Sequence, residues 1–366
     1  MKKSTFLIVV LVMLVGCGGG GSGDDPNQPE QSVSTNQDFR GKIFIGNDEA
    51  GPWLLDISTG HYSKIPGVNW TDNPDYHSRA EFSAFPAHDG QEFVETIERC
   101  EGLGGFDYQD CLIIHDAAGN VVSKFNVPYE TFGPAKLSRD GMFVAVLIRE
   151  PFSALNPKRL SIYTRDGAFV DSTSNDHDIT VKGFDWLPDN RLLYAVDRAM
   201  YVTNQTSGQS QQWATFTEDE GEPDHLAVSP NGQQLAFTLK TSVTYESIHG
   251  AVWVVNLDAS RFVQLATTPE VADPVINFPM WSPDGEWIAL IEGAVGVMFS
   301  PSENGQGSRI YIVPSDGENV ELTLDGDSEA IPVYSYYDEA LTPGSNAKLG
   351  VKFTTLVSGG GFSWVP

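Results

Sequence analysis

The chain has 366 residues, and its 49 acidic side chains outnumber its 22 basic ones, which gives a formal net charge of −27 at pH 7. A surface of this charge repels nucleic acids and anionic lipid headgroups, so we expect no nucleic-acid partner. The charge is typical of a solvated surface. The alternative is a face that attracts a basic partner or divalent cations.

The first 16 residues have the features of an export signal. Lys2 and Lys3 form a basic start, and the apolar run over 6–15 is too short to span a bilayer as a helix. The run ends in Leu-Val-Gly-Cys, which resembles the bacterial lipobox. The resemblance implies lipidation of Cys17 and, because Gly18 follows it, an outer-membrane location. The alternative is a plain secretory signal with a chance cysteine.

Residues 17–38 consist mostly of Gly, Ser, Asp, Asn, Gln and Pro and have almost nothing to bury. This composition predicts a flexible tether between the membrane and the rest of the chain. Residues 39–366 form a single predicted domain.

A short turn motif recurs through this domain. In its clearest form, Ser-Pro-Asp-Gly precedes the apolar run over 287–291. Proline sets φ at the first turn position, Asp can hydrogen-bond its own backbone, and Gly accepts positive φ. The turn Asp or Asn recurs at Asp89, Asp140, Asp189, Asn231 and Asp284. The next residue is Gly, or Asn190, whose residue type also tolerates left-handed φ. A period of about 40–50 residues predicts a propeller or a similar array.

Each repeat predicts four antiparallel strands, A before the turn and B, C and D after it. Apolar runs of about five residues bounded by Gly, Pro, Asn and Asp are typical of such strands. Five complete units are expected at about 79–127, 132–174, 180–216, 223–267 and 276–324. In the last unit, strand D is expected directly after the turn at 315–317. No stretch has a long helical period, so the predicted fold class is all-β.

The two ends of the domain complete a sixth blade. Residues 40–66 match strands B, C and D without an A strand before them, and 361–366 match the A strand at 279–283. We expect the C-terminal A strand to pair with the N-terminal strands, which closes the ring and removes exposed sheet edges. The sequence therefore predicts a six-bladed β-propeller.

Residues 325–359 do not fit this scheme, although they contain strand-like runs at 332–337 and 350–356. The prediction is a hairpin insertion. The alternative is a degenerate blade, which would make seven.

The strand–Ser-Pro-Asp-Gly–strand repeat resembles the TolB-type propeller repeat, which is related to WD repeats. The resemblance covers about 40–366, and four of the five turns fit it well; the turn at 87–90 lacks Ser-Pro. It implies a periplasmic or envelope location and a binding role.

Cys100 and Cys111 bracket a short loop between two apolar runs. In an oxidising compartment this arrangement predicts a disulfide that pins a hairpin loop. A loop this short gains about 3 kcal/mol in the chain-entropy model. A metal site is the weaker alternative, because no second Cys or His pair lies nearby.

The sequence lacks the motifs of known propeller enzymes. It has neither the Gly-x-Ser-x-Gly elbow of a fused peptidase nor the Ser-x-Asp-x-Gly-x-x-Trp turn of sialidases. No two histidines have the pair spacing of metal ligands, so we expect them on the surface or in loops; the alternative is convergence from different blades. They are His61, His77, His88, His115, His177, His225 and His249. The turn Asp residues are explained by their turns. We predict no catalytic residue, no metal site and no cofactor.

Long connections join strands B to C and D to A, and binding sites in propellers usually lie on the face that they build. They carry aromatic and imidazole side chains among Gly, Asn and Asp, which suit contacts with a peptide or glycan. Packing within the loops is the alternative. The predicted partner-binding residues are Trp70, Tyr76, His77, Tyr108, Phe152, Tyr245, His249 and Phe299.

The predicted function is that of a monomeric, lipid-anchored envelope propeller that binds a protein or peptide on its loop-rich face without catalysis. The alternative is a carbohydrate-active enzyme, a polysaccharide lyase or glycosidase with its centre at the channel mouth.

Overall fold

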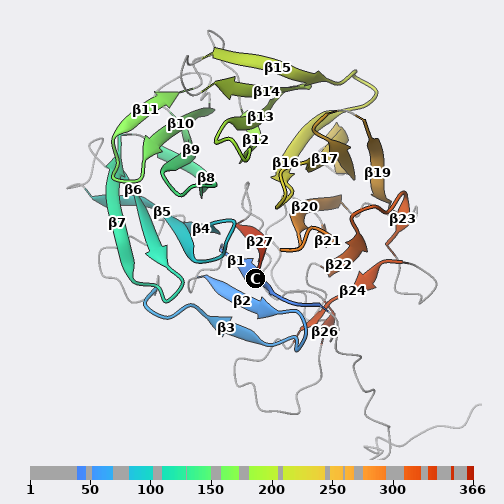
Figure 1. Cartoon of the computed structure of the whole chain (residues 1–366), viewed down its shortest axis with the longest axis horizontal. Helices are drawn as coiled ribbons and strands as arrows, with labels where there is room; N and C mark the ends of the chain where they lie inside the picture. Colours follow the sequence, from blue (N-terminus) through green and yellow to red (C-terminus); the bar gives the residue numbers. More distant parts are fainter. Residues whose placement is uncertain are drawn as a thin grey trace, which may run out of the picture. The chain divides into compact units, whose positions relative to one another are not determined.

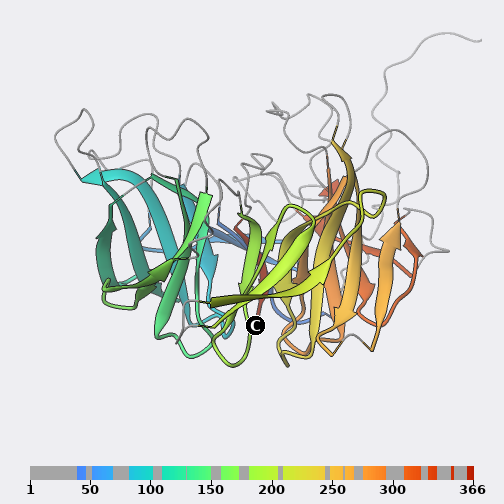
Figure 2. The ribbon, with the colours of Figure 1, turned by 90° about the horizontal axis from the view of Figure 1, so that it is seen from above.

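The computed structural model describes residues 39–46, 52–68, 82–101, 109–128, 130–149, 158–172, 181–204, 209–243, 248–258, 260–267, 275–293, 309–322, 329–335, 348–349 and 361–366. Six antiparallel sheets, the blades, stand in a ring around a common axis (Figure 1). Seen from the side, their strands run along this axis (Figure 2). These residues contain no α-helix, and the predicted all-β, six-bladed propeller is confirmed.

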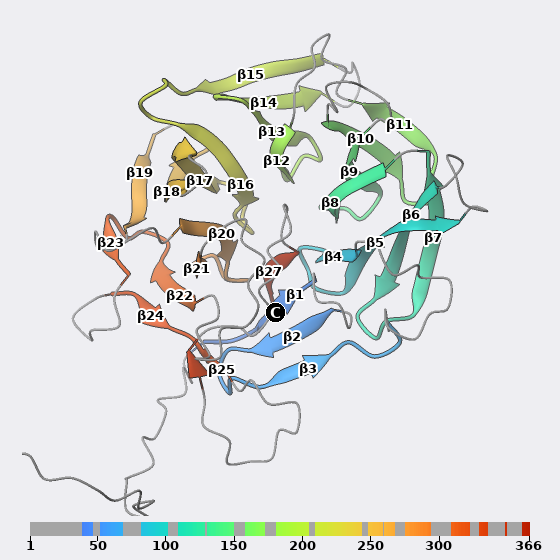
Figure 3. The ribbon, with the colours of Figure 1, turned by 180° about the vertical axis from the view of Figure 1, so that it is seen from behind.

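Blade 1 is built from both ends of the domain. Its strands, from the axis outward, are β27 (Phe362–Val365), β1 (Lys42–Ile45), β2 (Trp53–Asp56) and β3 (Tyr62–Lys64). β27 pairs antiparallel with β1, so that Lys42 lies opposite Val365 and Ile45 opposite Phe362. Figure 3 shows the C-terminus beside β1. The predicted ring closure is confirmed.

Blades 2 to 5 follow in chain order, close to the predicted units. Blade 2 contains β4 (Phe82–Pro86), β5 (Glu92–Glu101), β6 (Gln109–Asp116) and β7 (Val121–Val127). Blade 3 contains β8 (Glu130–Leu137), β9 (Phe143–Arg149), β10 (Lys158–Thr164) and β11 (Phe169–Ser172). Blade 4 contains β12 (Val181–Trp186), β13 (Leu192–Val196), β14 (Ala199–Asn204) and β15 (Gln209–Thr215). Blade 5 contains β16 (Glu222–Val228), β17 (Gln234–Val243), β18 (Ile248–Asn256) and β19 (Phe262–Thr267).

Blade 6 differs from its predicted form in the outermost strand. Its strands are β20 (Val275–Trp281), β21 (Trp287–Gly293), β22 (Arg309–Pro314) and β24 (Ile331–Pro332). The segment predicted as strand D forms β23 (Val320–Glu321), which pairs in parallel with β19 of blade 5. The prediction was wrong because Val320 and Leu322 are buried between blades 5 and 6, and Asn319 donates its backbone N–H to Gln264 O over 2.8 Å.

The outer strand of blade 6 comes instead from the segment predicted as an insertion. After β24, the short strands β25 (Tyr334–Ser335) and β26 (Lys348–Leu349) pair antiparallel. Part of the segment is thus a blade strand and not an insertion, and the predicted run at 350–356 lies outside the described residues. The alternative of a seventh blade is wrong.

The repeated turn has the predicted geometry. Ser282 Oγ donates to Asp284 Oδ1 over 2.5 Å, and the same oxygen accepts from the backbone N–H of Glu286 over 3.0 Å. In all five turns the fourth residue has φ between +61° and +77°, at Gly90, Gly141, Asn190, Gly232 and Gly285. In the same way, the side chains of Asp89, Asp140 and Asp189 each accept the backbone N–H of the residue two positions later.

The apolar core is divided into layers between neighbouring blades. Ile43 and Leu55 of blade 1 pack with Ile291 and Ile312 of blade 6, and similar clusters fill the other blade interfaces. Because apolar surface is buried between the sheets, each blade depends on both of its neighbours. The inner strands β4, β8, β12, β16, β20 and β27 are left to line the axis (Figure 1).

Candidate functional site

The six inner strands surround a cavity of about 310 Å³ on the axis of the propeller. Each contributes the residue that lies four positions before its turn Asp or Asn, or the matching residue of β27. These six are Phe85, Lys136, Asp185, Ala227, Met280 and Ser363. Since side chains alternate along a strand, the repeat turns the same position of every blade toward the axis.

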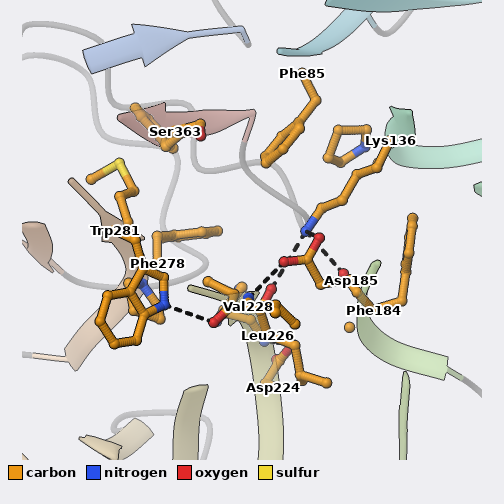
Figure 4. A pocket seen from close by; sticks show the side chains of 18 of the residues that line it. Phe85, Lys136, Phe184, Asp185, Asp224, Leu226, Val228, Phe278, Trp281 and Ser363 are labelled. Atoms are coloured by element: carbon orange, nitrogen blue, oxygen red, sulfur yellow. Dashed lines mark hydrogen bonds and ion pairs between the residues drawn. The ribbon is translucent and has the colours of Figure 1, made fainter. Parts of the chain in front are cut away.

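Lys136 extends from β8 into the channel wall (Figure 4). Its Nζ donates to the carbonyl oxygens of Phe184, at 2.9 Å, and Leu226, at 3.4 Å. Asp185 Oδ1 lies 3.5 Å from the same nitrogen. The ammonium group also lies 4.6 Å from the ring centroid of Phe85, within the range of a cation–π contact. One ammonium group therefore connects blades 3, 4 and 5.

Asp185 is only 4 % exposed and accepts the backbone N–H of Val228 over 2.7 Å. Burial by itself raises the pKa of this carboxyl, but the positive charge of Lys136 leads the effects that outweigh it, and the pKa lies below its ordinary value. Asp185 is therefore ionised at neutral pH and pairs with Lys136.

Arg139 bridges blades 3 and 5 at the end of the channel where the turns lie. Its guanidinium donates to three consecutive carbonyl oxygens, of Val228 at 3.2 Å, Ser229 at 2.9 Å and Pro230 at 3.0 Å. Burial lowers the pKa of this guanidinium, but the group stays charged. We call Lys136 and Asp185, which line the cavity, its polar floor.

His225 of β16 and Phe278 of β20 lie two residues farther from the turns. Their rings touch, with centroids 4.0 Å apart and planes at 47°. Nδ1 of His225 is buried and has no hydrogen-bond partner among the residues described here. Burial lowers the pKa of His225 to about 4, against the opposing effect of Asp224, so the imidazole is neutral at pH 7.

The other charged side chains near the cavity are also paired. Lys240 Nζ lies 2.5 Å from Asp224 Oδ2, and Lys182 Nζ lies 3.4 Å from Glu222 Oε2. Within the described ranges, no group of three His, Cys, Asp or Glu side chains is arranged to hold a metal ion. The lining thus offers apolar and aromatic surface, the neutral imidazoles of His88 and His225, and charges already matched to each other.

The predicted partner-binding residues fall almost entirely outside the described ranges. These are Trp70, Tyr76, His77, Tyr108, Phe152, Tyr245 and Phe299, and the predicted lipidation site Cys17 lies outside as well. His249 lies in β18, where the structure describes its backbone but not its side chain. The loop-rich binding face stays a prediction.

Cys100 of β5 and Cys111 of β6 form the predicted disulfide, with Cα atoms 5.8 Å apart. Ile97 and Ile113 pack beside it. The bond therefore pins the two strands where their connection begins and ends.

The histidine prediction was wrong for two residues. His115 is buried in β6, with Nε2 2.6 Å from Glu95 Oε2, and His225 lines the cavity from β16. His88 lies in a turn, as predicted, and also lines the cavity. A search for paired spacing cannot find residues that the ring brings together. The spacing from the turns could have identified these residues. Lys136 lies four positions before its turn Asp, and His225 and Phe278 each lie six positions before the turn Asn or Asp of their repeats.

No family model and no curated protein matches the chain. Among solved structures, a mutant of puromycin hydrolase matches with a TM-score of 0.50 and 15% identity over 76% of this chain and 44% of its own. A likeness at this identity shows a shared fold only.

The matches to two further structures cover nearly the whole length of those chains. A TolB-type protein from Agrobacterium tumefaciens matches with a TM-score of 0.49 and 17% identity, over 82% of this chain and 99% of its own. The periplasmic gluconolactonase of Pseudomonas aeruginosa matches with a TM-score of 0.47 and 16% identity, over 89% of this chain and 99% of its own. The six closed blades and their turns give this chain the architecture of a TolB-like propeller. In the described part of the chain, no helix is both long and apolar enough to cross a membrane.

Proposed function

We propose that this protein is a non-catalytic binding module of the bacterial cell envelope, which receives part of a protein or peptide partner in its central channel. The observation that carries the proposal is the lining of the cavity. Phe85, Met280 and Phe278 offer apolar contact surface, while Asp185 and Asp224 are each paired with a lysine. A carboxylate held in this way is a poor proton donor or acceptor, so the lining suits binding better than acid–base chemistry.

The proposed location draws on two features. The Cys100–Cys111 disulfide fits an oxidising compartment. The lipobox-like sequence supports a lipid anchor on Cys17, and Gly18 after it supports the outer membrane as its location. Replacing Cys17 by Ser is expected to move the protein from the membrane to the soluble fraction; unchanged fractionation would contradict the anchor.

Site-specific photo-crosslinking in cells that export the full chain tests the binding role. A photoreactive residue at Met280 or Ala227 faces the cavity, whereas one at Val122 or Phe169 lies on an exposed outer strand. We expect the cavity positions to give one discrete adduct that the outer positions do not give. The proposal would be contradicted if only the outer positions gave adducts, or if none of the four positions gave one.

The carbohydrate-active alternative stays a prediction. A panel of polysaccharides incubated with the purified protein tests it, with product release as the supporting outcome.

A further inference from the structure

Two residues of the channel hold a backbone conformation that their side chains disfavour. His225 has φ of +50° and Phe278 has φ of +52°. Each lies six positions before the turn Asp or Asn of its repeat, and Gly183 occupies the same position in β12. Because a Cβ atom crowds the backbone at positive φ, glycine would be less strained at both places. In all three strands the pairing shifts register here, so each position lies in a β-bulge, a feature that re-aims side chains and is frequent next to functional sites.

The strained positions bring two flat rings together on one wall of the cavity. The imidazole of His225 touches the phenyl ring of Phe278, which in turn packs on Phe362 with ring centroids 5.7 Å apart. Leu226 and Met280 also line the cavity. In Figure 4, Phe278 and Lys136 lie on different sides of the pocket. The cavity therefore has an aromatic wall as well as a polar floor.

His225 also brings an unused hydrogen-bonding atom. Its Nδ1 is buried without a partner among the described residues. Buried polar atoms are nearly always satisfied, so this nitrogen calls for an explanation, such as a bound group or an ordered water. A neutral imidazole carries one donor and one acceptor, and it can bond a hydroxyl or an N–H group.

Volume and charge narrow the class of ligand. A cavity of about 310 Å³ lies at the small end of ligand pockets, which measure about 300–1,000 Å³. Lys136, Asp185, Asp224 and Lys240 are paired within the protein, so the lining does not select a charged group. The remaining features select a ring-shaped, uncharged group with a hydrogen-bonding atom at its edge.

We propose that the cavity binds a single aromatic side chain of the partner that carries a hydrogen-bonding group, the phenol of tyrosine or the indole of tryptophan. Its ring lies against Phe278 and its polar atom bonds to His225. This inference rests on the proposed function, because it assigns the part of a polypeptide partner that enters the channel.

The test measures binding of short Gly/Ser peptides that differ at one central residue, which is Tyr, Trp, Phe, Leu or Ala. Titration of the full chain is followed by NMR, since a single side chain is expected to bind weakly. Peptides with Tyr and Trp are expected to bind about tenfold tighter than the Phe peptide, the value of one neutral hydrogen bond. The Leu and Ala peptides are expected to bind more weakly still.

Variants separate recognition from a structural role. His225→Gly removes the imidazole and relieves the backbone, so we expect an unchanged or higher melting temperature and equal affinity for the Tyr and Phe peptides. Phe278→Leu is expected to weaken binding of all three aromatic peptides. The matched control is Asp197→Gly, an exposed residue with φ of +48° outside the cavity lining, which should leave every affinity unchanged.

Equal binding of the Tyr and Leu peptides by the unaltered protein would overturn the inference, and so would a Tyr-over-Phe preference that survives in His225→Gly. If no peptide binds while Met280 still gives its cross-link, the inference is wrong and the proposed function stands. If the cross-link fails as well, both are wrong.

Discussion

At the scale of single residues, the channel wall depends on Lys136, whose ammonium group contacts β12 and β16 from its own strand β8. Its partner Asp185 is almost fully buried and ionised. Removing one member of such a pair leaves the other charged and without compensation in a poorly solvated place. The stability of the wall is therefore sensitive to a single substitution.

Lys136→Met keeps the length of the side chain but removes its charge. We expect it to lower the free energy of unfolding by about 3–5 kcal/mol, because Asp185 stays buried without its counter-ion. Urea unfolding followed by tryptophan fluorescence measures the change. The control is Lys182→Met, whose side chain is 37% exposed and whose pair with Glu222 is expected to contribute at most about 1 kcal/mol. Equal losses in the two variants would contradict this account.

His225 makes stability depend on pH. Its pKa is about 4 in the folded chain and about 6.5 when unfolded, so between these values the unfolded chain binds more protons. Stability therefore falls as the pH falls from about 6.5 toward 4. In His225→Gln, the free energy of unfolding is expected to decline less steeply over this range. The difference in slope corresponds to at most one proton fewer taken up on unfolding. Parallel pH profiles for the two proteins would show that His225 titrates normally.

Sequence reasoning identified the turn residues but not the channel residues. Asp284 and Gly285 could be predicted because turn conformation depends on the residue types in the turn itself. The pair of Lys136 with Asp185 joins two blades, and nothing near either residue indicates its partner. The number of residues from the turn predicts how far along the channel a side chain lies. Which side chains meet there depends on closure of the ring.

At the scale of elements, β27 joins the two ends of the domain. Phe362, Trp364 and Val365 are buried between blades, and Trp364 Nε1 donates to Arg40 O over 3.0 Å. The strand is short, yet it completes the sheet of blade 1 and contributes to the layer that blade 1 shares with blade 6. Its loss affects both ends of the chain at once.

Deletion of 362–366 removes this strand. We expect the free energy of unfolding to fall by about 5 kcal/mol, the value of three large buried side chains. Calorimetry and urea unfolding measure the effect, with deletion of 29–33 in the predicted tether as the control. A truncated chain as stable as the control would show that β27 does not close the ring.

The outer strand of blade 6 shows where prediction of elements stops. The segments at 320–321 and 331–332 are each only two residues long, too short for a strand pattern to decide which one completes the blade. β23 pairs with β19 because Val320 and Leu322 fill the layer between blades 5 and 6. That choice is made by packing between blades, which no local pattern contains.

At the scale of the whole molecule, six small sheets with apolar layers between them enclose one cavity. The inner strand of every blade faces the axis. Substitutions at the same repeat position in different blades therefore all change the lining of the one cavity. The polar floor connects blades 3, 4 and 5, and the aromatic wall comes from blades 5 and 6. A binding module built in this way can vary its ligand by changing a few inner residues while its turns and layers stay the same.

Methyl NMR of the methionines tests most directly whether the channel is the binding site. Met280 lines the cavity, whereas Met142 is 56% exposed in a turn and provides a control within the same sample. The ligand is the partner segment recovered by cross-linking, prepared as a peptide. We predict that the Met280 methyl resonance shifts on titration while the Met142 resonance stays in place. A shift at Met142 with none at Met280 would contradict the account.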